Sequence, residues 1–177
     1  MELVSQELKD LGLSLTPEFL TAHEEQILLE KINNIQRRRE MSGTARTSVS
    51  RFGSDQYYGS NMQSKIIPDY LMEYAERLVA QGLVPVLTDS ISINEYNPGQ
   101  VIPPHIDNLS AGLVITVLSL KSPATMRFTL EKQGLNIVLP PRSVVQIRGE
   151  IRNTWKHEIL PVPAHRFSVV FRGGVVS

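Results

Sequence analysis

A histidine and an aspartate stand two positions apart in the segment VIPPHIDNLS, residues 101–110. In an extended chain the residues at positions i and i+2 point to the same side, so His105 and Asp107 can reach one metal ion. A pair of this kind also occurs in ordinary loops, where both side chains make hydrogen bonds to their surroundings. The pair therefore indicates a metal site only if another part of the chain supplies further ligands.

A third candidate ligand lies much further along the chain. His157, one of four histidines, is part of the strand-like segment WKHEI, residues 155–159. Two histidines and one carboxylate, with other positions left open, form the ligand set of non-haem Fe(II) oxygenases, and zinc accepts the same types of ligand. His105, Asp107 and His157 thus predict a metal site whose metal stays open, and a packing role is the alternative for His157.

Two strand-like segments carry polar side chains on one face. The segment RFSVVFR places Arg166, Ser168 and Arg172 on one side, with aromatic and aliphatic residues on the other. Because guanidinium groups bind carboxylates through paired hydrogen bonds, the two arginines could hold both ends of a small dicarboxylate. Asn94 and Tyr96 share a face in the same way and offer hydrogen bonds to an oxygen-rich ligand. The alternatives are an exposed strand with solvated arginines, a cross-strand contact of Asn94 and a core position for Tyr96.

The elements that must position these residues follow from local patterns. Thr21 and Glu24 have the spacing of a capping box, and apolar residues then recur with helical period up to Ile35. A second helix is predicted between Pro68 and Gly82, which suit the start and the end of a helix. From about residue 84 the pattern changes to short alternating segments separated by Pro and Gly. Strands are predicted at 91–96, 113–120, 125–130, 136–139, 143–148, 155–159 and 167–171.

Composition limits the classes of protein and of site. A chain of 177 residues is expected to form a single domain, 1–177, and many short strands at this spacing predict an antiparallel sandwich or barrel. The absence of cysteine excludes disulfides, thiolate catalysis and iron–sulfur clusters. No apolar run approaches the roughly 18 residues of a membrane span, and the N-terminus carries acids rather than the basic region of a signal peptide. We therefore expect no membrane association and an intracellular location, in the cytoplasm or nucleus.

Charge is balanced over the chain but not along it. Lys and Arg number 18, as do Asp and Glu, whereas residues 31–55 contain six basic and two acidic residues, a local net charge of +4. This segment is either a solvated surface or a phosphate-contacting one. It overlaps the Ser-, Thr- and Gly-rich residues 41–60, which are predicted to form a long loop or a hairpin, and loops of this length often have a function.

In order along the chain, the candidate residues resemble the AlkB family of Fe(II)- and 2-oxoglutarate-dependent dioxygenases: Asn94, Tyr96, His105, Asp107, His157, Arg166 and Arg172. The likeness covers about residues 84–174, and NEYNPGQVIPPHID and RFSVVFR are its most specific segments. Within the family, the sequence of these segments is more similar to the tRNA wobble-uridine hydroxylase branch than to the bacterial DNA-repair founder. The resemblance implies a mainly β, α+β chain with a double-stranded β-helix (jelly-roll) core at 84–174, supported by helices in 1–83.

The resemblance also implies roles for individual residues. His105, Asp107 and His157 would ligate Fe(II), and the cofactors would be Fe(II), 2-oxoglutarate and O2. Arg166 and Tyr96 would hold the distal carboxylate of 2-oxoglutarate. Asn94 and Arg172 would contact its metal-proximal end, and Ser168 replaces an asparagine of some members. The reaction would be hydroxylation, or oxidative demethylation where the hydroxylated group is an N-methyl.

The resemblance specifies the substrate less closely than it specifies the reaction. DNA-repair members carry a base-reading acid two positions after the metal-binding aspartate, where this chain has Leu109, so repair of methylated adenine or cytosine is in doubt. Residues 41–60 correspond to the family's nucleotide-recognition lid. This region and its surroundings carry side chains suited to phosphate contact or base stacking, or alternatively to anchoring the loop on the sheet: Arg46, Arg51, Phe52, Tyr57 and Tyr58.

Nucleic acid, either RNA or single-stranded DNA, is thus the expected partner. A protein side chain is the alternative substrate, suggested by the zero net charge and by Leu109. A non-catalytic RNA-binding barrel is a third hypothesis, disfavoured by the complete ligand set. A zinc hydrolase would leave the paired arginines without a role.

Overall fold

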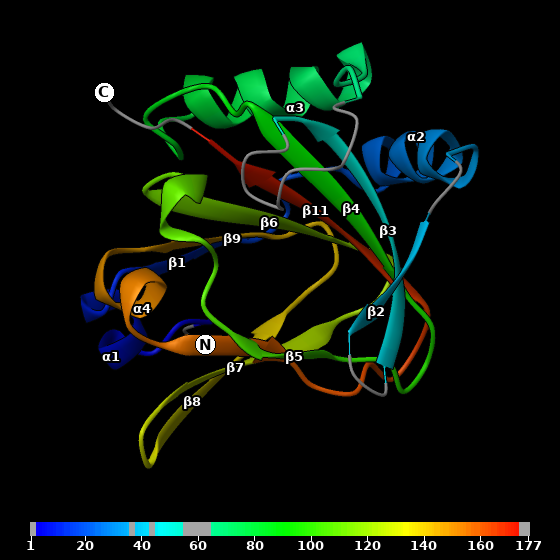
Figure 1. The fold of residues 1–177 in the computed structure, drawn as a ribbon. Helices are drawn as coiled ribbons and strands as arrows, with labels where there is room; N and C mark the ends of the chain where they lie inside the picture. Colours follow the sequence, from blue (N-terminus) through cyan, green and yellow to red (C-terminus); the bar gives the residue numbers. More distant parts are fainter. Residues whose placement is uncertain (1–2, 36–37, 43–44, 55–64, 174–177) are drawn as a thin grey trace.

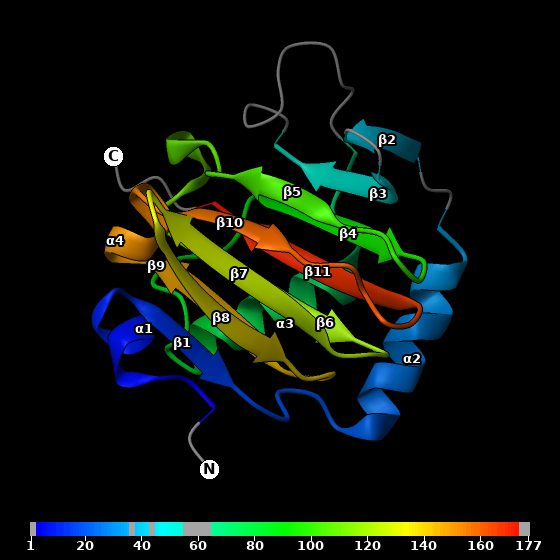
Figure 2. The ribbon, with the colours of Figure 1, turned by 90° about the horizontal axis from the view of Figure 1, so that it is seen from below.

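Two antiparallel sheets face each other and enclose the candidate site. The computed structural model describes residues 3–35, 38–42, 45–54 and 65–173, and of 38–42 and 45–47 only the backbone. Figures 1 and 2 show the larger sheet under two helices and the smaller sheet on its opposite side. The predicted double-stranded β-helix with N-terminal helices is confirmed.

The larger sheet contains seven strands and the smaller sheet four. In spatial order the larger sheet is β1 (Leu13–Thr16), β9 (Val144–Arg148), β6 (Val114–Leu120), β11 (Arg166–Arg172), β4 (Ser90–Tyr96), β3 (Ala45–Gly53) and β2 (Arg38–Ser42). The smaller sheet is β5 (Ile102–His105), β10 (Lys156–Ile159), β7 (Ala124–Leu130) and β8 (Gln133–Leu139). The C-terminal strand β11 lies in the middle of the larger sheet, paired with β4 on one side and β6 on the other.

Helices α2 (Ala22–Asn33) and α3 (Asp69–Ala80) cover the outer face of the larger sheet (Figure 1). The capping box predicted at the start of α2 is present, since Thr21 Oγ1 accepts from the Glu24 amide and Glu24 accepts from the Thr21 amide. The apolar faces of both helices are buried against the alternate residues of β4 and β11 that point outward from the site, including Ile93 and Phe167. This outer core holds the two central strands rigidly from behind.

A second apolar cluster fills the space between the sheets. It joins residues of the larger sheet, such as Val117 and Ile147, to Met126 and Phe128 of the smaller sheet, with Trp155 beside them. The polar candidate residues line the same interior, so an apolar core and a polar cavity share one sandwich. Within the described residues, no helix is long and apolar enough to cross a membrane.

The part of the chain before residue 84, expected to be helical support, also contributes strands. β1 pairs with β9, and the hairpin β2–β3 extends the larger sheet beyond β4. The two short helices α1 (Gln6–Asp10) and α4 (Gly149–Asn153) were not predicted either. These elements escaped prediction because they are short, and because edge strands gain their stability from the neighbour with which they pair.

The segment 41–60 is a hairpin in its described part rather than an irregular loop. Phe52 is 7% exposed and belongs to the cluster under the helices, so it anchors β3, as the alternative interpretation predicted, and is unavailable for base stacking. Tyr57 and Tyr58 lie outside the described residues, and so does the side chain of Arg46.

The turn that follows Asp107 is held against the end of β11 by a backbone contact that only glycine permits. Gly112 has a φ of +95°, and a Cβ at this position would lie 2.2 Å from the carbonyl oxygen of Gly173. The Gly173 amide in turn donates to the carbonyl of Ala111 over 3.1 Å. Both the φ value and the close approach therefore require glycine at position 112.

Gly112→Ala should destabilise the protein much more than Gly82→Ala, which serves as its matched control. Gly82 also has a positive φ, +68°, but apart from its chain neighbours no atom of the described residues lies within 4 Å of its hypothetical Cβ. Gly82→Ala is expected to cost about 1 kcal/mol through backbone strain alone. For Gly112→Ala we expect at least about 2 kcal/mol more, because a rigid backbone must move. Equal losses in urea unfolding would show that the Gly112–Gly173 contact does not constrain the turn.

Candidate metal centre and co-substrate pocket

The pairing of β5 with β10 brings the two histidines together. His105 is the last residue of β5, and His157 is its direct cross-strand partner in β10. Their ring centroids are 4.3 Å apart. Residues directly opposite on antiparallel strands point to the same face of the sheet, here the face toward the larger sheet. Two positions distant in sequence thus become neighbours through one strand pair.

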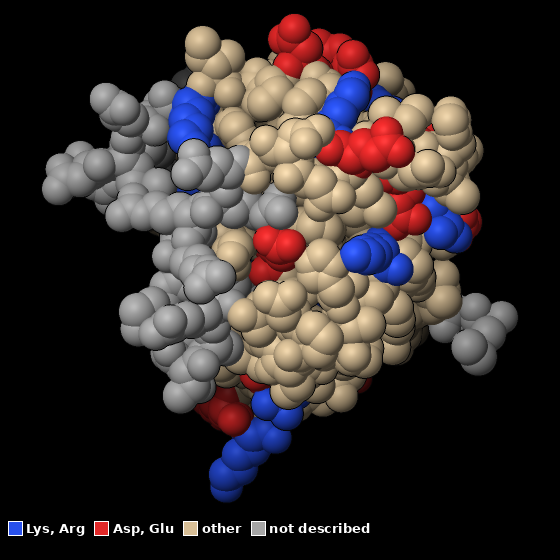
Figure 3. Space-filling view, turned by 90° about the vertical axis from the view of Figure 1, so that its right-hand side faces the viewer, with Lys and Arg blue, Asp and Glu red and all other residues tan. Residues whose placement is uncertain are grey.

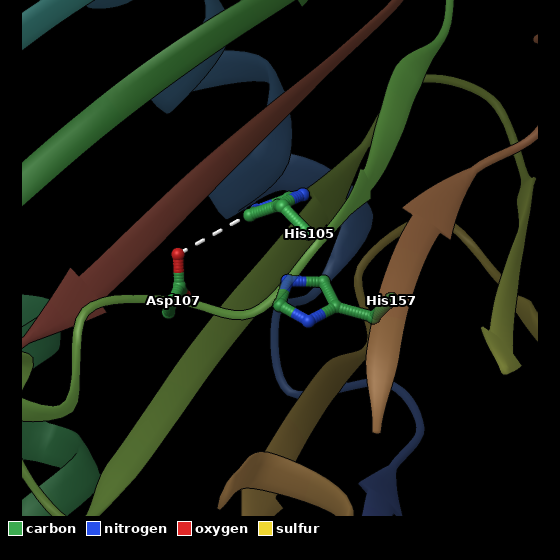
Figure 4. A group of neighbouring side chains, drawn as sticks. All are labelled: His105, Asp107 and His157. Atoms are coloured by element: carbon green, nitrogen blue, oxygen red, sulfur yellow. Dashed lines mark ion pairs between the residues drawn. The ribbon is translucent and has the colours of Figure 1, made fainter. Parts of the chain in front are cut away.

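Asp107 completes the group from the loop that follows β5. Figure 4 shows its carboxylate turned toward the imidazole of His105, with His157 beside both. Asp107 Oδ1 is 3.6 Å from His105 Nε2, and one ligand atom of each of the three residues lies within 4.8 Å of the others. The structure therefore brings together all three residues predicted as metal ligands.

The hydrogen bonds of the histidines leave nitrogen lone pairs free for a metal. His105 Nδ1 lies 2.9 Å from the carbonyl oxygen of Pro103, which can only accept, so in the neutral ring Nδ1 carries the proton and Nε2 a lone pair. Burial lowers the pKa of His157 from 6.5 to about 4, with the charge of His105 acting in the same direction. His157 is accordingly neutral near pH 7, as a metal ligand must be.

The pKa values of His105 and Asp107 are shifted in opposite directions. For His105, burial is outweighed by the contacts with Asp107 and with the Pro103 carbonyl, and its pKa is raised above 6.5. For Asp107, burial is outweighed by Arg172 and the two histidines, which hold its pKa far below the ordinary 3.8. Arg172 Nη2 lies 3.6 Å from Asp107 Oδ1. Asp107 is therefore a carboxylate at any physiological pH.

The residues present fit a divalent metal. Asp107 Oδ2 and His157 Nδ1 are both buried, and neither has a hydrogen-bond partner in the described part of the chain. Unsatisfied buried polar atoms are rare in native proteins and indicate a missing ion, water or ligand. Two imidazoles and one carboxylate suit Fe(II) or zinc, with further positions open for other ligands.

A buried guanidinium lies at the other end of the same cavity. Arg166 is fully buried, with Nη2 donating to Ser119 Oγ over 3.1 Å and its Cζ atom 5.0 Å from the ring centroid of Tyr96. Its Nε and Nη1 atoms have no hydrogen-bond partner among the described residues, and burial lowers its pKa. A cation buried without a counter-charge is strongly unfavourable, so its free donors indicate an anionic ligand.

The register of β4 against β11 places the remaining predicted residues on the faces of these strands that line the cavity. Arg166 lies opposite Tyr96, and Ser168 lies opposite Asn94. Ser168 Oγ contacts both neighbours, at 3.3 Å from Asn94 Nδ2 and 3.4 Å from the Tyr96 hydroxyl. The alternation of the two strands thus predicted correctly which side chains share a face.

All eight predicted site residues line one cavity of about 410 Å³, its open mouth included. Six apolar side chains complete the lining: Ile102, Ile115, Val117, Met126, Ile159 and Val170. Sequence patterns did not single out these residues, because their types are those of any core. Ser119, which contacts Arg166, was missed for a similar reason, since it lies inside a mostly apolar strand.

On the side of the molecule with α2, the described side chains do not form an extended basic face. Figure 3 shows acidic and basic side chains interspersed among the described residues of this side. Part of the charge is paired, as in Arg142, which bonds to Glu18 and Glu25. Of the six basic residues of segment 31–55, only Lys31 and Arg51 have side chains within the described part of the chain, so its contact with phosphate stays a prediction.

Known proteins resemble this chain over most of its length. The model of the 2OG-Fe(II) oxygenase superfamily matches residues 12–172. The chain is 32% identical to the tRNA (carboxymethyluridine(34)-5-O)-methyltransferase ALKBH8 of Mus musculus, covering 94% of this chain and 27% of that protein. It is 31% identical to the alkylated DNA repair protein ALKBH8 homolog of Arabidopsis thaliana, covering 96% of this chain and 56% of that protein. The chain thus spans about a quarter to about half of the length of these relatives. Among solved structures, that of OsALKBH1 superposes with a TM-score of 0.69 at 16% identity, over 92% of this chain and 98% of that one.

The lowered pKa of His157 should make the metal-free protein less stable as the pH falls. The unfolded chain binds a proton at this position below its ordinary pKa of 6.5, whereas the folded chain binds it only below about 4. Between these values the unfolded state therefore binds more protons, and acidification destabilises the fold by up to about 3 kcal/mol. The unfolding free energy should be measured for wild type and His157→Gln in the presence of a chelator, from about pH 7 to about pH 4.5. As the pH falls, it should decrease more for wild type than for His157→Gln. Parallel curves would contradict burial of a neutral imidazole.

Proposed function

Because this chain belongs to the 2OG-Fe(II) oxygenase superfamily, and within it to the AlkB family, we propose that it is a dioxygenase that hydroxylates or oxidatively demethylates a modified nucleotide. RNA or single-stranded DNA is the proposed substrate, and Fe(II) and 2-oxoglutarate are the proposed metal and co-substrate. The AlkB resemblance found in the segments around His105 and Arg166 is confirmed.

One observation carries the proposal. A three-residue metal group with two imidazoles and a carboxylate shares a cavity with a buried arginine whose free donors lack a partner. The metal group alone would also suit a zinc hydrolase. A buried cation at the far end of the cavity fits a ligand that presents a second, anionic end, and 2-oxoglutarate is a dicarboxylate.

In this proposal the residues divide into three groups. His105, Asp107 and His157 hold the metal, and Arg166 with Tyr96 binds the distal carboxylate of the co-substrate. Arg172 keeps Asp107 ionised and contacts the metal-proximal end of the co-substrate. Bound iron, with 2-oxoglutarate and O2, supplies the oxidising chemistry, so the chain's own task is to orient these groups.

The apolar part of the lining has a complementary role. Ile115, Val117 and Met126 line the cavity that the metal group and Arg166 share. Their side chains exclude water from the interior and strengthen the electrostatic contacts of the buried arginine.

The substrate class is supported by the relatives and by the loop that follows Asp107. The named activities of the Mus musculus and Arabidopsis thaliana proteins concern tRNA and alkylated DNA, respectively. Leu109, at the position of the base-reading acid of repair enzymes, is 65% exposed on the loop after Asp107. An apolar side chain there cannot accept a hydrogen bond from a base, so we favour a modified nucleotide other than the methylated adenine or cytosine of repair. We accordingly propose that the enzyme acts inside the cell, in the cytoplasm or nucleus.

Turnover of 2-oxoglutarate to succinate tests the enzyme class. His105→Ala should abolish succinate formation by the iron-loaded protein, since it removes a proposed ligand. His23→Ala, which changes an exposed histidine of α2, is the matched control and should leave the rate unchanged. Full activity of His105→Ala would refute the assignment of this site.

Arg166→Lys should weaken 2-oxoglutarate binding while the charge is kept. The lysine lacks the planar pair of donors that binds a carboxylate, so we expect the KM for 2-oxoglutarate to rise about 10- to 100-fold with a smaller change in kcat. Arg127→Lys alters a partly exposed ion pair with Glu158 and should change neither constant. An unchanged KM in Arg166→Lys would place the co-substrate elsewhere.

A panel of short RNA and single-stranded DNA oligonucleotides, each with one modified nucleotide, tests the substrate class. We expect the wild type, but not His105→Ala, to add one oxygen or remove one methyl group, as detected by mass spectrometry. Protein extract treated in parallel tests the alternative. Oxidation of a protein side chain with no change in any oligonucleotide would transfer the function to a protein substrate.

A further inference from the structure

Arg152 is a buried cation near the metal group that has no role in the site described so far. It lies in α4, five residues before His157 in the sequence, and is 2% exposed. Its Nη2 atom donates to the backbone carbonyl of Asn108 over 2.8 Å. Its Nε and Nη1 atoms are also buried, and the described part of the chain offers them no hydrogen-bond partner.

The carbonyl that Arg152 holds belongs to the residue directly after Asp107. This oxygen also accepts from the Ala111 amide over 2.9 Å, while the Asn108 side chain accepts from the Ser110 amide. Asn108 therefore caps the N-terminus of the short helical turn Leu109–Ala111, and Arg152 holds its carbonyl from another element. A carbonyl that accepts a charged donor is held more strongly than one with neutral partners.

The element that carries Arg152 is itself fixed. The Ile151 amide donates to the Leu11 carbonyl, and the Arg148 amide donates to the Gly12 carbonyl, so α4 is tied to the turn between α1 and β1. Its Ile151 side chain is fully buried in the cluster between the sheets. Arg152 thus links a rigid support to the loop that carries Asp107.

The charges around Arg152 are those of the site. Burial lowers its pKa, attraction to Asp107 raises it, and repulsion by Arg172 lowers it further. Its direct bond is nevertheless to a backbone oxygen and not to the carboxylate. The contact therefore controls where the loop lies, and the charge of Arg152 adds to the positive potential around a dianionic co-substrate.

We propose that Arg152 is a positioning residue, which holds the loop after β5 so that Asp107 faces His105 and His157 in the geometry that the metal requires. The proposal rests on the proposed function, since it assumes that these three residues bind a metal. It explains how the loop that carries Asp107 is held in place, which the three ligand residues by themselves do not explain.

The direction of the change in metal affinity tests the proposal. We would titrate the metal-free protein with Mn²⁺, a stable stand-in for Fe²⁺, and follow free Mn²⁺ by its EPR signal. Arg152→Met removes the donors and the charge, and should weaken binding about 10- to 100-fold, as loss of outer support typically does. A purely electrostatic role predicts the opposite, because removal of a nearby positive charge favours a cation. Arg152→Lys, which keeps the charge and one donor group, should fall between wild type and Arg152→Met.

The matched control is Arg148→Met, which removes a guanidinium from the same stretch of chain. Arg148 contacts Ser14 and not the site, so its Mn²⁺ affinity should stay within about twofold of wild type. Hydrogen exchange should also accelerate at the Ala111 amide in Arg152→Met, but not at the central strand amide of Ile93. A purely structural role would instead lower the melting temperature with no selective change at either readout.

The outcomes separate this proposal from the proposed function. Unchanged or tighter Mn²⁺ binding by Arg152→Met, with tight binding by wild type, would overturn the positioning role alone. Absence of Mn²⁺ binding by wild type would overturn both proposals. If Arg152→Met does not fold, Arg152→Lys decides the question, because affinity and Ala111 exchange equal to wild type would contradict a role for the planar guanidinium.

Discussion

The antiparallel pairing of β5 with β10 is the interaction on which the rest of the site depends. It sets His157 directly opposite His105, and both side chains point between the sheets. A slip of one residue in this register would turn one imidazole to the outer face of the smaller sheet, and the three candidate ligands would no longer lie together. The flanking pair of β10 with β7 is continuous over four residues and holds the register where β5 is short.

The space between the sheets contains both an apolar core and a polar cavity, and the two occupy different parts of it. Aliphatic and aromatic side chains fill the space around Met126, Phe128 and Trp155, whereas β4 and β11 present their polar faces to the cavity. The uncompensated guanidinium of Arg166 makes the ligand-free protein less stable than an apolar core would be. In our proposal the same unsatisfied donors bind the co-substrate. The group that lowers the stability of the ligand-free protein is therefore also the one that gives affinity for 2-oxoglutarate.

Support from outside the site is as important as the site residues themselves. Helices α2 and α3 pack behind β4 and β11, and the rigid outer core fixes the spacing of Asn94, Ser168 and Arg172 on the inner face. Asp107 has no strand to hold it. Its loop is fixed instead by the Gly112–Gly173 contact on one side and the Arg152–Asn108 bond on the other.

The sequence by itself determined the ligand types, the strand faces and most of the regular elements, because strand alternation and helix caps are local and depend on few residues. Arg166, Ser168 and Arg172 could be assigned to one strand face on this basis, and the spacing of His105 and Asp107 placed them on one side of an extended segment, although Asp107 lies in the loop after β5. Only the tertiary structure decided that His157 lies beside His105, that Arg166 is without a counter-charge and that Phe52 is an anchor, since each depends on pairing or burial between distant segments. Arg152 and Ser119 could not be found in advance for the same reason: an arginine in a short helix or a serine in an apolar strand has no local signature, and its role is set by what packs around it.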